Sequence, residues 1–95
     1  LDRANLTEAN LTDADLRKAK LNKAMLYKAD LTGANLEDSE LCNALIKGAN
    51  LSNCKLMGAF VKDTNMTDAI AIGADFGGLR MDRIVGHETL LFTED

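Results

Sequence analysis

Few side chains in this 95-residue chain could take part in nucleophilic, acid–base or metal chemistry. The chain has one histidine, His87, and two cysteines, Cys42 and Cys54. A zinc site needs about four such ligands at suitable spacing, and these three residues do not supply them. We therefore interpret His87 as an exposed residue near the C-terminus, and we expect neither a metal site nor a cofactor.

A five-residue repeat runs without insertion or deletion from Ala4 to Gly78. The third residue of each unit is apolar, the residue two positions before it is small, and the residue between them is usually polar. Residues two apart in an extended segment point to the same side, so the small and central residues face an interior. The predicted core residues are the centres Leu6, Leu11, Leu16, Leu21, Leu26, Leu31, Leu36, Leu41, Ile46, Leu51, Leu56, Val61, Met66 and Phe76.

The centre Ala71 is the exception, because it is smaller than every other central residue. Either Ile70 or Ile72 turns inward through a local bulge, or the interior narrows at this level.

A strict period of five fits neither an α-helix, whose apolar stripe repeats every 3.6 residues, nor a plain strand. It favours about three extended residues followed by a turn. The last position of a unit holds glycine or, often, asparagine or aspartate, the residues that best tolerate positive φ. The glycines expected in these turns are Gly33, Gly48, Gly58, Gly73 and Gly78.

This pattern of alanine, asparagine or aspartate, leucine and two polar residues resembles the pentapeptide-repeat proteins, over about four fifths of the chain. The resemblance is to the leucine-centred members, which are common in photosynthetic bacteria. It implies an all-β solenoid, namely a right-handed quadrilateral β-helix of about four coils with four units per coil. Charge pairing does not choose the coil length, because opposite charges are equally frequent at separations of 15 and 20 residues.

The domain organisation predicted from the repeat is a β-helix over residues 1–78 and a C-terminal capping segment over residues 79–95. In that segment Met81, Ile84 and Val85 have helical spacing, and residues 90–92 form an apolar cluster. The alternative role for residues 79–95 is a dimerisation arm. The first residues are already in register with no cap before them, so we expect upstream repeats or self-association through the N-terminal coil.

Composition narrows the classes of partner. The net charge is −4 and both signs are interleaved, so the basic surface of a nucleic-acid-binding protein is not expected. No apolar run is long enough for a membrane span or a signal peptide, which predicts a cytoplasmic protein. On the four-sided fold the two cysteines lie on different sides, so reduced thiols are expected.

These features predict a protein that is not an enzyme. The carboxylates Asp15, Asp30 and Asp75 occupy outward positions, and a filled solenoid has flat walls without a catalytic cleft. Flat polar walls suit a rigid protein-interaction scaffold. The candidate partner-binding residues are the outward apolar side chains Met25, Tyr27, Leu45, Met57 and Phe60, although scattered surface residues are the simpler alternative.

The other hypothesis for function is mimicry of DNA. Some pentapeptide-repeat proteins bind DNA gyrase through acidic rows that resemble duplex phosphates. Those proteins favour phenylalanine centres and a strongly negative surface, whereas this chain has mostly leucine centres and many outward lysines. The resemblance does not identify the protein partner.

Overall fold

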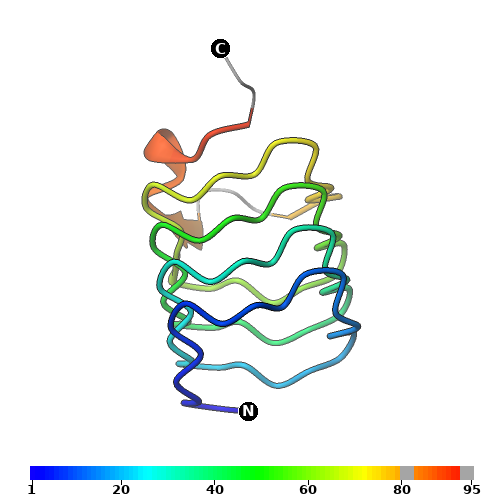
Figure 1. Cartoon of the computed structure of the whole chain (residues 1–95). Coiled ribbons are helices and arrows are strands. Elements are labelled where there is room, and N and C mark those ends of the chain that lie inside the picture. Colours follow the sequence, from blue (N-terminus) through cyan, green and yellow to red (C-terminus); the bar gives the residue numbers. More distant parts are fainter. Residues whose placement is uncertain (80–82, 93–95) are drawn as a thin grey trace.

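The computed structural model describes residues 1–79 and 83–92 of the chain as a solenoid of stacked coils (Figure 1). Parallel bridges join residues that are 20 positions apart, beginning with Asn5 to Met25 and continuing as far as Lys55 to Asp75. One coil therefore takes four repeat units. The charge pattern could not make this choice between 15 and 20 residues, and the backbone bonding makes it.

The hydrogen bonds between coils repeat in every unit. The N–H of Leu6 donates to the carbonyl of Met25 at 2.7 Å, and the N–H of Met25 donates to the carbonyl of Ala4 at 2.8 Å. Within a unit boundary, Ala9 donates to the carbonyl of Leu6 at 3.0 Å and closes the turn. The extended segments are so short that most form single bridges. The two-residue strands β1 (Thr64–Asn65) and β2 (Ile84–Val85) pair in parallel.

The last residue of each unit has a left-handed backbone. Glycine provides it at the four predicted positions Gly33, Gly48, Gly58 and Gly73, with φ of 73°, 70°, 77° and 73°. Lysine also adopts it, at Lys18, Lys23 and Lys28, which the argument from glycine and asparagine did not anticipate. The prediction for Gly78 was wrong, because the positive φ belongs to Gly77, whose N–H donates to the Asp75 carboxylate at 2.8 Å.

The core follows the predicted pattern. The buried centres are Leu21, Leu26, Leu31, Leu36, Leu41, Ile46, Leu51, Leu56, Val61 and Met66. Leu6, Leu11, Leu16 and Phe76 are partly buried and pack against this cluster. The first three belong to the lowest coil, which has a neighbouring coil on one side only in this structure.

The small centre Ala71 keeps its inward place and is 1% exposed. Ile70 and Ile72 stay outside and are half-buried, and Ile70 bridges Asn50 in the regular register. The inward bulge considered for these isoleucines is therefore wrong, and the narrower interior is the arrangement found.

The segment after the repeats continues the solenoid, and it is not helical at Ile84 and Val85. These residues form β2, whose Ile84 is opposite Thr64 in β1. The 3-10 helix η2 (His87–Thr89) then absorbs one additional residue, so that Leu91 bridges Ile70 at a separation of 21 instead of 20. Met81, the third residue of the predicted helical pattern, lies outside the described residues.

No helix within residues 1–79 and 83–92 combines the length and the hydropathy that crossing a membrane would require.

Candidate interaction surface

The outward residues stack into four columns, each made of one residue per coil. The first column is Asn5, Met25, Leu45, Asn65 and Val85; the second is Asn10, Asp30, Asn50, Ile70 and Leu91; the third is Asp15, Asn35, Lys55 and Asp75; and the fourth is Lys20, Glu40 and Phe60. Because main-chain hydrogen bonds join each level to the next, the columns present side chains at a fixed spacing of about 4.8 Å.

Asparagine and aspartate in these columns have a structural role. The Asn65 side-chain oxygen accepts the N–H of Thr67 at 3.0 Å and its hydroxyl at 2.6 Å, and Asn5 accepts the N–H of Thr7 at 3.2 Å. Each such side chain therefore satisfies the first N–H of the turn that follows it, which is the usual behaviour of these residues in turns.

The fourth column satisfies its turns in another way, from the coil below. Asp2 accepts the N–H of Asn22 at 2.9 Å, and Asn22 accepts the N–H of Cys42 at 3.0 Å. The Asn22 amide also donates to Glu40 at 2.9 Å. Glu40 lies next to Lys20 in the column, yet these two side chains form no ion pair within 4.0 Å among the interactions of the described residues.

Some turns lack this acceptor. Among the described residues, the equivalent N–H group has no hydrogen-bond acceptor at Tyr27, Lys47, Met57, Lys62 and Ile72. In each of these turns the preceding outward residue is not asparagine or aspartate. Only Tyr27 and Lys47 lie in the same position of consecutive coils.

The five candidate partner-binding residues do not form one patch. Met25 and Leu45 are bridged neighbours in the first column, and Tyr27 lies in the turn that follows it. Met57 lies in the turn after the third column and Phe60 in the fourth column, with 52% and 61% of their surfaces exposed. Two columns separate the turns of Tyr27 and Met57 in either direction around the coil.

A depression of about 500 Å³ lies at the turn after the first column, lined by Tyr27, Lys28, Lys47, Gly48 and Asp68. Sequence reasoning selected only Tyr27 from this group. A signal for the others was present, because Met25 and Leu45 interrupt the run of asparagines in their column and lysines follow in both turns.

A second depression, of about 480 Å³, lies beside Phe60. Its wall combines apolar residues with two cations, and the residues that line it are Cys42, Ala59, Phe60, Val61, Lys62, Gly78, Leu79 and Arg83. It opens where the chain passes from Leu79 to Arg83, next to the undescribed residues 80–82.

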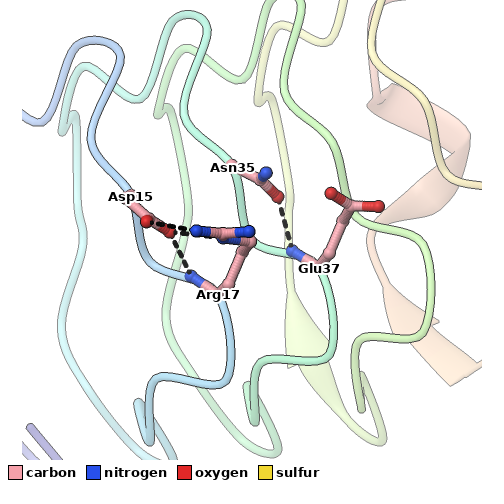
Figure 2. A network of polar contacts seen from close by, with 4 residues as sticks. All are labelled: Asp15, Arg17, Asn35 and Glu37. Carbon is pink, nitrogen blue, oxygen red and sulfur yellow. Dashed lines mark hydrogen bonds and ion pairs between the residues drawn. The ribbon is translucent and has the colours of Figure 1, made fainter.

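The third column carries a polar network (Figure 2). Arg17 donates to both carboxylate oxygens of Asp15, at 2.9 and 2.8 Å, and its N–H donates to the same carboxylate at 3.2 Å. These bonds lower the pKa of Asp15 to about 2, and they raise that of the Arg17 guanidinium. In the next coil Asn35 accepts the N–H of Glu37 at 3.1 Å (Figure 2).

The outward carboxylates considered for catalysis are engaged in turns. Hydrogen bonds from the Thr32 hydroxyl and N–H lower the pKa of Asp30, and Asp75 accepts the N–H of Gly77. Together with Asp15, these groups act as acceptors that stabilise the backbone, an arrangement that does not resemble a pair of catalytic carboxylates with divergent pKa values.

Both cysteines are free thiols in different surroundings. Cys54 is buried, its sulfur donates to the carbonyl of Leu31 at 2.8 Å, and burial raises its pKa to about 12. Cys42 is half-buried at the surface. His87 is exposed in η2, 3.7 Å from the Glu88 carboxylate, and no group of three metal-binding side chains converges within the described residues.

Comparison with protein families gives eight copies of the pentapeptide repeat, in matches to residues 1–38, 26–63 and 44–83. The chain belongs to the pentapeptide-repeat family. The repeated unit, the 20-residue ladder and the leucine and alanine interior are the features of this chain that the assignment explains. Comparison with curated protein sequences gave no match.

The pentapeptide-repeat fold is also found among solved structures. Rfr23, a pentapeptide-repeat protein from the cyanobacterium Cyanothece 51142, is 33% identical and superposes with a TM-score of 0.92, covering 98% of this chain and 63% of its own. A pentapeptide-repeat protein from the Arabidopsis thaliana thylakoid lumen is 23% identical with a TM-score of 0.65, covering 90% and 58%. The chain thus spans less than two thirds of the length of either protein.

Proposed function

We propose that this chain is a non-catalytic, rigid protein-interaction module, and that its partner binds at the first column. The observation that carries the proposal is the bridged pair Met25 and Leu45, two apolar side chains in a column that has asparagine above and below them. Main-chain hydrogen bonds hold both levels in place, so little conformational entropy is lost when a partner binds.

We further propose the complete architecture on which this module depends. It is a right-handed quadrilateral β-helix of about four coils over residues 1–78, closed by residues 79–95. The buried Leu90, 6% exposed, and the edge-to-face contact of Phe76 with Phe92, whose ring centroids are 5.6 Å apart, support a capping role over that of a dimerisation arm.

Self-association through the N-terminal coil is part of the same proposal, as is a cytoplasmic location. Leu6, Leu11 and Leu16 are only partly buried, whereas the equivalent leucines one coil higher are fully buried. Further coils or a second copy would bury them. We expect a protein partner and not a membrane or a nucleic acid, because the outward columns mix acidic, basic and neutral side chains.

DNA mimicry gains no support from the outward columns. The third column alternates Asp15, Asn35, Lys55 and Asp75, and Arg17 neutralises the first of these carboxylates. A row of phosphates would instead require unpaired negative charge at successive levels.

Affinity capture from extracts of the native host tests the interaction module. The test variant is Met25→Asn with Leu45→Asn, which makes the first column resemble its own Asn5 and Asn65 levels. The matched control is Ile70→Asn, the same kind of change in the second column. A partner that the wild type and the control retain and the double variant loses would support the proposal. Equal capture by all three proteins would contradict it.

A further inference from the structure

Two main-chain donors in the turn after the first column point outward without an acceptor. At the equivalent turns Thr7 and Thr67, the N–H donates to Asn5 and Asn65 in the outward column. The backbone repeats every 20 residues, so the N–H groups of Tyr27 and Lys47 have the same direction. Met25 and Leu45 replace the asparagines and provide no oxygen.

These two donors are neighbours. The carbonyl of Lys47 accepts the N–H of Lys28 at 3.1 Å, which places the two turns in contact in consecutive coils. The donors are therefore separated by roughly 4.8 Å, a distance that the two oxygens of one carboxylate can bridge with a hydrogen bond to each.

The other turns without an acceptor do not form such a pair. Below Met57 and Lys62 lie Glu37 and Cys42, whose N–H groups are bonded to Asn35 and Asn22. The turn at Ile72 lies above Ser52, whose N–H is bonded to Asn50. Two stacked free donors occur only at Tyr27 and Lys47 within the described part of the chain.

The surroundings of the paired donors favour an anion. Lys28 and Lys47 are exposed and form no ion pair with any described residue. Asp68 at the upper edge leaves the five lining residues with two positive charges and one negative charge. At Gly48 an added Cβ would meet only the Lys28 Cγ, at 3.5 Å, so the floor of the depression is open there.

We propose that Tyr27, Lys28, Lys47 and Gly48 form a binding site for the carboxylate of an acidic peptide segment whose neighbouring residues are apolar. The two N–H groups bind the carboxylate oxygens, and the lysines strengthen these bonds because charge-assisted hydrogen bonds are the stronger ones. Met25 and Leu45 contact the apolar neighbours, which a free inorganic anion would leave uncovered. The inference rests on the proposed function, since it names what the partner presents at the first column.

Titration of the ¹⁵N-labelled chain with a short synthetic peptide, a glutamate between two leucines, tests the site. We expect the amide signals of Tyr27 and Lys47 to shift most. A matched peptide with glutamine in place of glutamate should bind at least about tenfold more weakly. Equal binding of the two peptides, or no shift of these two amides, would overturn the proposal.

Inorganic phosphate is the second probe. We expect it to bind more weakly than the acidic peptide, because it cannot cover Met25 and Leu45. Phosphate binding that equals or exceeds peptide binding at the same two amides would overturn the assignment to a peptide and indicate a simple anion site.

Variants separate this site from the proposed function. Met25→Asn with Leu45→Asn gives both N–H groups an internal acceptor and should weaken peptide binding at least about tenfold. Lys47→Gln should weaken it and reduce its salt dependence, and Ile70→Asn should leave it unchanged. Unchanged binding to the double variant would overturn the site. Capture of a partner that still depends on the first column, without any peptide binding, would overturn this inference alone and leave the interaction module standing.

Discussion

The hydroxyl of Thr64 donates a hydrogen bond to the carbonyl oxygen of Leu41, 23 residues earlier, inside the solenoid. Cys54 makes the same contact with Leu31 through its thiol. Both replace the usual alanine of the small inward position. Ser39 is also buried at this position, but its hydroxyl has no partner. A buried polar group can therefore be either bonded or costly at the same place in the repeat.

Ser39→Ala should stabilise the protein by about 1 kcal/mol, because it removes a buried hydroxyl that forms no hydrogen bond. Thr64→Val, which keeps the shape of the side chain, should destabilise by about 1 kcal/mol through loss of the bond to Leu41. Urea denaturation of the two variants gives both values. A loss of stability in Ser39→Ala would mean that the hydroxyl is satisfied, for example by a buried water molecule.

Leu36→Ala should cost about 3 kcal/mol, because Leu36 is fully buried between coils and its removal leaves a cavity. Leu11→Ala makes the same change in the partly buried first coil and should cost less, about 1 kcal/mol. Thermal and urea denaturation measure the difference. Equal losses would contradict the burial of Leu36 between two coils or the exposure of the first coil.

Gly86→Ala tests whether the C-terminal segment packs on the last coils. Gly86 has φ of 79°, and an added Cβ would lie 2.7 Å from the Cα of Thr67, where only backbone movement could relieve the contact. Gly48→Ala is the control, with φ of 70° and no contact closer than 3.5 Å.

The control should lose about 1 kcal/mol through its left-handed backbone alone, and Gly86→Ala should lose more than twice as much. We also expect faster amide exchange at Ile84 and Leu90 in Gly86→Ala. Equal losses in the two variants would argue against packing of β2 on β1.

Arg17→Gln should raise the pKa of Asp15 from about 2 toward its ordinary value of 3.8, because the hydrogen bonds from the Arg17 side chain are the main cause of the shift. A lowered pKa in the folded state stabilises the fold above the ordinary pKa, and this contribution is lost as the pH falls from 3.8 to about 2. NMR titration of the carboxylates measures it. Asp30, whose pKa is lowered by Thr32, is the internal control and should not change in the variant.

The repeat itself was predictable because the small and central residues recur every five positions with almost no exception. The coil length was not. Exposed charges such as Lys20 and Glu40 do not need to pair, and Glu40 accepts a hydrogen bond from Asn22 instead. Charge patterns in a solvated wall therefore carry little information about which units are neighbours.

The C-terminal segment was misjudged for a related reason. Leu79 breaks the motif, yet Ile84 takes the place above Thr64, and η2 absorbs the additional residue before Leu91. Main-chain pairing tolerates departures of this kind, which a fixed sequence period cannot represent.

The interaction surface was only partly predictable. The apolar residues Met25, Tyr27 and Leu45 stand out in the sequence, and Met57 and Phe60 were wrongly grouped with them. Assigning columns requires the coil length. The role of the outward asparagines as acceptors also became clear only from the hydrogen bonds of the turns.

Amide hydrogen exchange at Tyr27 and Lys47 tests the central claim most directly. In the free protein we expect these two amides to exchange fast, whereas Leu26 and Lys28, which donate to Leu45 and Lys47 at 2.7 and 3.1 Å, exchange slowly. Addition of the acidic peptide or of the captured partner should then protect Tyr27 and Lys47. Slow exchange of both amides in the free protein, or no protection in the complex, would contradict the account.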